Sequence, residues 1–315
     1  MSRLLTTVSA ITVIASTYVN ADVPKVVADI APIHSLVSRV MDGIGEPKLI
    51  VPNETSPHDY RLRPADAQAI EDANLVFWMG EGLTPWMERA LEALNSDTDV
   101  VEFLALEDSV RLAFREGALF EAHDDHDDHD KDHDDHDDHA GHDHGEFDPH
   151  AWLSTSNAKT WLNVIAAKLS SVDPNNAGTY FANASQARNE LDALDAEINA
   201  MLGPVRGGKF IVFHDAYQYF EAVYDIPASG AISLGDASDP SAARIAEIAN
   251  RIKTENIDCV LSEPQFNARL VKTVMGATDA KTQVIDPIGF GIESGSSLYP
   301  KLIRSMAQSL VDCLK

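Results

Sequence analysis

The sequence predicts an α/β fold made of two lobes with parallel sheets, joined by one long helix. Three observations lead to this architecture. Strand and helix patterns alternate in both halves of the chain, and a helical segment of unusual length lies between the halves. The 315 residues are 44% hydrophobic, which is enough apolar material to build more than one substantial core.

Short apolar runs alternate with helix-like periodicity in the first half. The run Leu75–Met79 is closed by Gly80, as is typical of a buried strand, and Pro64–Ala73 starts with a proline in its first turn, as many helices do. The expected strands are Lys25–Ile30, Leu49–Val51 and Leu75–Met79, and the expected helices are Ile33–Met41, Pro64–Ala73, Trp86–Leu94 and Asn157–Leu169. Such alternation indicates a parallel sheet covered on both faces.

The segment Asp173–Leu202 predicts the long helix. Asp173 and Pro174 suit a helix start, and Gly203 with Pro204 suits its end. A helix of about 28 residues would span about 42 Å. Because one lobe does not need a helix of that length, we expect it to bridge two lobes.

The second half repeats the alternation. Its expected strands are Phe210–Phe213, Cys259–Leu261 and Gln283–Ile285, and its expected helices are Ala216–Tyr224, Ser241–Thr254, Ala268–Met275 and Tyr299–Leu314. The predicted division of the chain is therefore an N-terminal lobe at residues 22–172, a linking helix at 173–203 and a C-terminal lobe at 204–315.

The first residues predict export. Arg3 gives a positive start, Leu4–Ala15 is largely apolar, and Val19-Asn20-Ala21 resembles a cleavage site with small residues. We expect residues 1–21 to be a signal peptide, since the apolar run is too short to span a bilayer comfortably. No later segment has a transmembrane pattern.

Charge and histidine gather in one stretch. The net charge is −26, and residues 121–148 carry −13 of it. So acidic a chain does not suit nucleic acid, which needs a basic surface. The run from His123 to His144 lacks the apolar side chains of a core, so we expect a disordered loop at about residues 121–147. Its imidazoles and carboxylates predict a secondary, weak metal-binding loop, with a plain acidic linker as the alternative. The histidines are His123, His126, His129, His133, His136, His139, His142 and His144.

The other four of the 12 histidines are dispersed. Three of them, His58, His150 and His214, lie at or near the ends of expected strands. Ligands of open α/β sheets bind at the ends of strands, so we expect these histidines at the cleft between the lobes. Imidazole nitrogens suit Zn²⁺, whereas Mn²⁺ prefers more oxygen. Asp286 also ends a strand and is the favoured fourth ligand, with a turn-capping role as its alternative. We assign His34, inside a first helical turn, a structural role.

The chain has two cysteines, Cys259 and Cys313. In an oxidising compartment they can form a disulfide that pins the last helix to the sheet, and the alternative is two unpaired buried thiols. Neither cysteine has the CxxC spacing of a metal or redox site.

Five motifs in order carry a resemblance to a known family. They are Ser56-Pro57-His58-Asp59-Tyr60, Asp148-Pro149-His150-Ala151-Trp152-Leu153, Phe213-His214-Asp215-Ala216-Tyr217, Ser262-Glu263-Pro264-Gln265-Phe266 and Asp286-Pro287-Ile288-Gly289. Together they resemble the periplasmic zinc-binding proteins of ABC transporters, the ZnuA type of the cluster 9 solute-binding family, over essentially the whole mature chain.

The resemblance implies two Rossmann-like lobes joined by a rigid helix, a periplasmic location and delivery of Zn²⁺ to an ABC permease in the inner membrane. It also implies that His58, His150 and His214 bind the metal, and that Cys259 and Cys313 form a disulfide. Some zinc members have a ligating Glu just before the first histidine, where this chain has Pro57. That leaves Asp286 or water as the fourth ligand.

The leading hypothesis is therefore a high-affinity transport protein that works as a monomer and has no enzymatic activity. Two alternatives remain. Three histidines with an open water position also occur in zinc enzymes, although the sequence has no HExxH motif and no evident general base. The chain could instead be a zinc buffer that acts mainly through its histidine-rich loop.

Overall fold

The computed structural model describes residues 23–93, 98–115, 120, 147–233, 241–265, 276 and 280–315. The predicted signal peptide, the helix expected at Ala268–Met275 and the eight histidines from His123 to His144 lie outside the described residues.

The N-terminal sheet has four parallel strands in the order β2-β1-β3-β4. The strands are β1 (Val26–Ala28), β2 (Lys48–Leu49), β3 (Leu75–Trp78) and β4 (Asp99–Glu102), and the helices are α1 (Ala31–Val40), α2 (Pro64–Glu71) and α3 (Pro85–Glu92). The edge strand β4 was not predicted, because acidic residues stand at both of its ends and only Val101 is buried. The buried β3 was predicted from its apolar run and is confirmed.

The C-terminal sheet repeats this design with the parallel order β6-β5-β7-β8. Its strands are β5 (Phe210–His214), β6 (Ala231–Ser233), β7 (Cys259–Ser262) and β8 (Lys281–Val284), and its described helices are α6 (Gln218–Tyr224) and α7 (Ala242–Thr254). The edge strand β6 was also missed, since Ile232 is its single large apolar residue. Two parallel sheets with helices confirm the predicted fold class.

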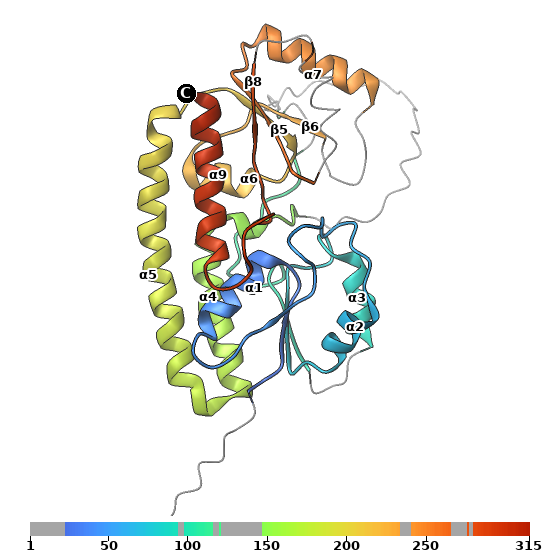
Figure 1. The fold of residues 1–315 in the computed structure, drawn as a ribbon, viewed down its shortest axis with the longest axis vertical. Coiled ribbons are helices and arrows are strands. Elements are labelled where there is room, and N and C mark those ends of the chain that lie inside the picture. Colours follow the sequence, from blue (N-terminus) through green and yellow to red (C-terminus); the bar gives the residue numbers. More distant parts are fainter. Residues whose placement is uncertain are drawn as a thin grey trace, which may run out of the picture.

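Three long helices lie along one side of both sheets, as Figure 1 shows. They are α4 (Thr155–Val172), α5 (Ala177–Leu202) and α9 (Leu298–Leu314), with short 3₁₀ turns at Ala151–Leu153, Pro174–Asn176 and Gly203–Val205. The predicted linking helix is α5, whose stripe Tyr180, Leu191, Leu194 and Ile198 is buried.

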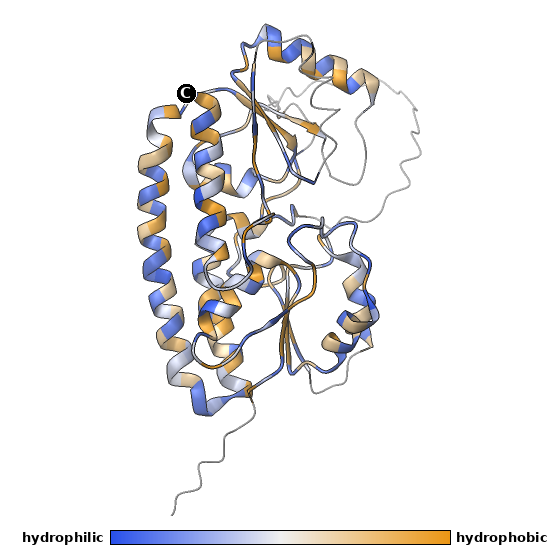
Figure 2. Cartoon of the chain, viewed as in Figure 1, coloured by the Kyte–Doolittle hydropathy of each residue, from blue (hydrophilic) through white to orange (hydrophobic). Residues whose placement is uncertain are grey.

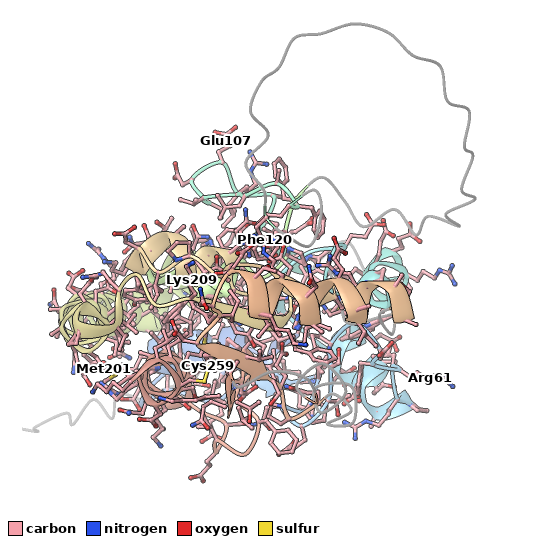
Figure 3. The ribbon with its side chains drawn as sticks, turned by 90° about the horizontal axis from the view of Figure 1, so that it is seen from above. Arg61, Glu107, Phe120, Met201, Lys209 and Cys259 are labelled. Carbon is pink, nitrogen blue, oxygen red and sulfur yellow. A yellow bond between two sulfur atoms is a disulfide. The ribbon has the colours of Figure 1, made fainter. Side chains whose placement is uncertain are left out.

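Helix α9 also joins the two lobes, which was not predicted. The backbone N–H of Tyr299 at its start donates to Ser35 Oγ in α1 (2.9 Å), and Arg304 binds Glu197 of α5. At its other end Cys313 forms a disulfide with Cys259 of β7 (Cα–Cα 5.7 Å), which confirms the predicted pair and is labelled at Cys259 in Figure 3. The C-terminal helix is thus fastened to both halves of the molecule.

One apolar core runs through both lobes. It extends from Val26 in β1 through the long helices to Leu310 in α9, while a smaller cluster around Ile248 and Val260 fills the space between α7 and the C-terminal sheet. In Figure 2 the central strands of both sheets are coloured hydrophobic, whereas the edge strand β8 is largely hydrophilic. No helix in the described part of the chain is long and apolar enough to cross a membrane.

Candidate metal centre

Three histidines predicted from separate motifs meet between the lobes. The ring centroids of His58 and His150 lie 5.6 Å apart, and those of His150 and His214 lie 5.2 Å apart. The Nε2 atoms of His150 and His214 are 3.4 Å from each other. These imidazoles line a small cavity together with Ser56, Pro57, Trp152, Glu263, Gln265, Pro287 and Ile288.

Each histidine is placed by a different local structure. His214 is the last residue of β5, and His150 lies directly before the 3₁₀ turn Ala151–Leu153. His58 lies within the loop between β2 and α2, and this loop is held by a hydrogen bond from Trp86 Nε1 to the carbonyl oxygen of Pro57 (3.0 Å). Because β5 belongs to the second sheet, the cavity draws ligand groups from both lobes.

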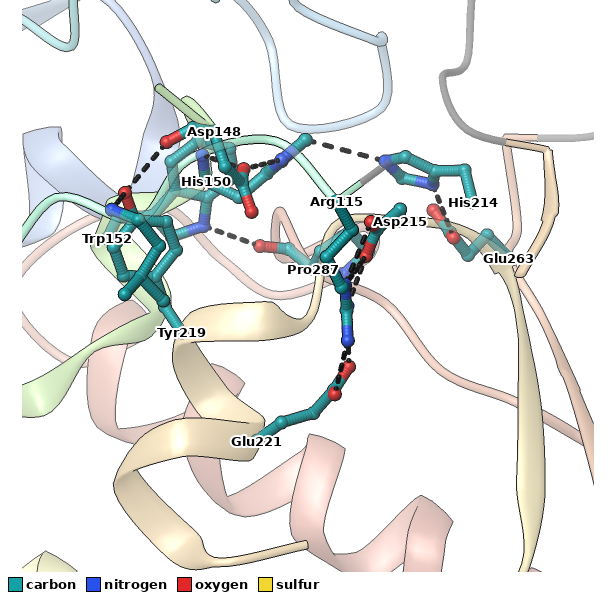
Figure 4. A network of polar contacts seen from close by, with 11 residues as sticks. Arg115, Asp148, His150, Trp152, His214, Asp215, Tyr219, Glu221, Glu263 and Pro287 are labelled. Atoms are coloured by element: carbon teal, nitrogen blue, oxygen red, sulfur yellow. Dashed lines mark hydrogen bonds and ion pairs between the residues drawn. The ribbon is translucent and has the colours of Figure 1, made fainter. Parts of the chain in front are cut away.

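A buried carboxylate stands behind each of two histidines (Figure 4). Asp148 Oδ1 lies 2.7 Å from His150 Nδ1, and Glu263 Oε1 lies 2.6 Å from His214 Nδ1. A carboxylate at Nδ1 fixes the ring orientation and leaves Nε2 as the nitrogen for a metal, the arrangement usual for metal-binding histidines. Both Nε2 atoms indeed face each other across the cavity.

Asp148 is further anchored by the chain around it. Its Oδ1 accepts the backbone N–H of His150 (2.9 Å), so one oxygen orients both the ring and the backbone of that residue. Burial raises the pKa of Asp148 to about 7, an effect that the His150 N–H and the nearby charge of Arg115 oppose.

Asp286 lies behind the cavity wall and does not line it. Its Oδ1 accepts the backbone N–H of Ile288 (3.1 Å) and the side-chain amide of Gln265 (3.3 Å), and its Oδ2 accepts the N–H of Gly289 (2.9 Å). Burial raises the pKa of Asp286 against these hydrogen bonds. The turn needs a glycine at Gly289, where φ is +98° and an added Cβ would meet Leu298 at 3.2 Å.

The cavity has room for an ion and little else. The volume within it that is open to the centre of a water molecule is about 20 Å³. A single bound water needs about this volume. Within the described residues, no group of three or more histidine, cysteine and carboxylate side chains is arranged to hold a metal as it stands. Occupancy by an ion would therefore require small side-chain adjustments.

His34 lies away from the cavity. It is buried in α1, where its Nε2 contacts the carbonyl oxygen of Pro47 (3.0 Å). Desolvation by burial lowers the pKa of this imidazole, which favours the neutral form. This position fits the structural role expected from the sequence.

Glu263 is the site residue that reasoning from the sequence missed. The signal was present, because Glu263 directly follows β7 just as Asp286 closely follows β8, and parallel strands end at one edge of a sheet. Its role differs from that of a direct ligand, because Glu263 acts on His214 from behind.

Comparison with known proteins places this geometry in a family. The family model of ZnuA, the periplasmic component A of the zinc-uptake complex, matches residues 26–313. The chain belongs to the ZnuA family. This confirms the resemblance read from the five motifs. The ZnuA family comprises uptake components and not enzymes, as predicted.

Relatives in the ZnuA family match over nearly their whole length. The high-affinity zinc uptake system protein ZnuA of Brucella abortus is 45% identical over 304 residues, which cover 92% of this chain and 91% of the relative. The ZnuA protein of Paracoccus denitrificans is 41% identical over 302 residues and covers 93% of both.

Solved structures share the fold. A crystal structure of ZnuA matches with a TM-score of 0.75 at 21% identity, covering 93% of this chain and 100% of that chain. A zinc-bound deletion mutant of ZnuA matches with a TM-score of 0.74 at 22% identity, covering 93% and 99%. At these identities the likeness establishes the two-lobed architecture.

Proposed function

We propose that this protein captures Zn²⁺ in the periplasm with high affinity and delivers it to an ABC transporter, whose membrane permease and ATPase complete the uptake system. The observation that carries the proposal is the meeting of three imidazoles from both lobes around an ion-sized cavity. Family membership and the zinc-uptake function of the Brucella and Paracoccus relatives support it.

The spacing of the imidazoles suits zinc. With Zn–N bonds of about 2.0–2.1 Å, two nitrogens on a tetrahedral zinc lie about 3.3 Å apart, and their ring centres lie about 5 Å apart. The Nε2 atoms of His150 and His214 are 3.4 Å apart, and the ring centroids are separated by 5.2 and 5.6 Å. Ligation of one ion by His58, His150 and His214 therefore needs only small movements.

For the fourth position the sequence favours Asp286, with water as the alternative. Three hydrogen bonds tie the Asp286 carboxylate to its own turn and to Gln265. Moving this carboxylate into the cavity would break those bonds in a buried place, at a cost of about 1–3 kcal/mol for each donor left unpaired. We therefore propose water as the fourth ligand, with Asp286 supporting the wall that carries Gln265.

Several features beyond the cleft belong to the same proposal. Residues 1–21 direct export, the eight histidines of the acidic loop bind zinc weakly, and the mature protein works as a monomer. The proposed division of the chain is an N-terminal lobe at residues 22–172, a linker at 173–203 and a C-terminal lobe at 204–315. The zinc-enzyme alternative is disfavoured by a cavity with room for little more than an ion.

The experiment that tests the proposal is a zinc titration against a competing chelator, with the mature chain and with a chain that lacks residues 123–144. We expect one tight site in both. Loss of tight binding in the shortened chain would assign capture to the histidine-rich loop and overturn the cleft as the primary site.

A further inference from the structure

Arg115 stands between the lobes and binds two carboxylates of the C-terminal lobe (Figure 4). Its Nε donates to both oxygens of Asp215 at 3.0 Å, and Nη1 and Nη2 donate to Glu221 at 2.8 and 3.1 Å. The three side chains are 17%, 7% and 5% exposed, so little water competes for these bonds. A planar guanidinium held by two carboxylates has a fixed position and orientation.

The backbone before Arg115 is tied to the loop that carries His150. Ala113 forms an antiparallel bridge with Phe147, and the N–H of Asp148 donates to the carbonyl oxygen of Leu112 (2.8 Å). Arg115 and Asp148 are therefore parts of one hydrogen-bonded unit, and Asp148 is the residue that orients His150.

A tyrosine of α6 closes the network from the other lobe. The hydroxyl of Tyr219 accepts the N–H of Leu112 (2.9 Å) and donates to the carbonyl oxygen of Asp148 (2.9 Å). The side-chain amide of Gln218 is oriented so that its nitrogen donates to Asp148 Oδ2 (3.1 Å) and to the carbonyl oxygen of Ala113 (3.2 Å). Helix α6 thus holds the His150 loop directly.

These contacts form a path between two imidazoles that does not pass through the metal. The path runs from His150 through Asp148 and Leu112 to Arg115, and from there to Asp215, the neighbour of His214. We infer that Arg115 is a positioning residue that fixes the spacing of His150 and His214 across the two lobes. This inference rests on the proposed function, because the spacing matters only if both imidazoles bind one ion.

Fixed spacing gives a physical basis for metal selectivity. A site held to within about 0.5 Å of a tetrahedral arrangement suits Zn²⁺, whereas a looser site also accepts ions of higher coordination number. Outer partners of metal ligands change affinity by about 10–100-fold when they are lost. Arg115 acts one step further out than Asp148, so we expect the lower end of that range.

The test compares four variants of the mature chain. Arg115→Lys keeps the charge but loses the planar fork, Arg115→Met removes both, and Tyr219→Phe removes the hydroxyl bridge. Arg304→Met is the matched control, since Arg304 also binds a carboxylate, Glu197, through Nε and Nη2, but on the exposed faces of α9 and α5. For each we would measure zinc affinity with a competing chelator, and the visible absorption of bound Co²⁺, which is stronger in four-coordinate sites.

We expect Arg115→Met to weaken zinc binding about tenfold, and its Co²⁺ bands to lose intensity. The zinc affinities and Co²⁺ band intensities of Arg115→Lys and Tyr219→Phe should lie between those of Arg115→Met and the parent. Those of Arg304→Met should match the parent. Parent-like affinity and Co²⁺ spectra in both Arg115→Lys and Tyr219→Phe would overturn the inference, even if Arg115→Met did not fold. A parent chain without tight zinc binding would instead overturn the proposed function.

Discussion

The two histidine–carboxylate pairs of the cavity are chemically alike but are built in different ways. His150 and Asp148 are two residues apart in one loop, and the same carboxylate oxygen also binds the backbone N–H of His150. His214 and Glu263 are 49 residues apart on neighbouring strands. One pair depends on a local turn, and the other depends on the pairing of a sheet.

Strand register explains the second pair. In the β5–β7 ladder Phe210 lies opposite Cys259 and Ile211 opposite Val260, an offset of 49 residues. The same offset places His214, the last residue of β5, opposite Glu263, which directly follows β7. A slip of the register by one residue would turn Glu263 to the other face of the sheet and leave His214 without its partner.

The largest effect in this comparison should come from removing the imidazoles themselves. His150→Ala and His214→Ala each delete a proposed zinc ligand, so we expect each to weaken zinc binding by more than about 100-fold, beyond the usual loss of an outer partner. His34→Ala, which changes a histidine outside the cavity, is the control for affinity. Chelator competition at neutral pH measures the change, and retained tight binding in either cavity variant would remove that histidine from the site.

The next largest effect should separate the two carboxylates. Glu263→Gln and Asp148→Asn keep the shape of each side chain and remove its charge, and we expect losses of about 10–100-fold. Glu263→Gln should be the more damaging change, because Asp148 lies two residues from His150 in the same loop and its Oδ1 also accepts the backbone N–H of His150, whereas Glu263 reaches His214 from another strand end. Equal losses in the two variants would mean that the local anchor of Asp148 contributes nothing.

A smaller effect on zinc affinity should come from protonation of the ligand imidazoles. An imidazole must be neutral to bind zinc, so affinity should fall as the pH drops below about 6.5, by about tenfold per pH unit for each ligand imidazole. His58→Ala should therefore reduce the slope of log affinity against pH by about one between pH 6 and 5. Titrations at several pH values would measure this slope, with Arg304→Met as the control, and an unchanged slope would exclude His58 as a ligand.

The residues of the site differ in how far the sequence reveals them. His214 could be picked out because it ends a strand-like run, and the end of a parallel strand is a recognisable position. His58 was found from the loop that follows β2, whereas the expected strand end at His150 was wrong, because His150 lies directly before a 3₁₀ turn. Glu263 and Arg115 act through contacts 49 and 100 residues away in the chain, and such contacts exist only after the sheets have formed. The edge strands β4 and β6 were missed because acidic residues stand at both ends of β4 and because β6 has a single large apolar residue, Ile232.

The smallest effect is expected at Asp286, whose carboxylate accepts two N–H groups of its own turn beside the cavity. Asp286→Asn keeps an acceptor oxygen for only one of the two N–H groups, that of Ile288 or that of Gly289, and loses the charge. A carboxylate that is not a ligand should nevertheless change zinc affinity less than about tenfold when it is replaced. The same chelator competition used for the histidines measures it, with Glu263→Gln beside it as the carboxylate whose loss should matter more. A loss above about 100-fold in Asp286→Asn would place its carboxylate on the metal in the fourth position. The ladder of β7 and β8 would then supply a ligand in the same way as the ladder of β5 and β7 supplies the partner of His214.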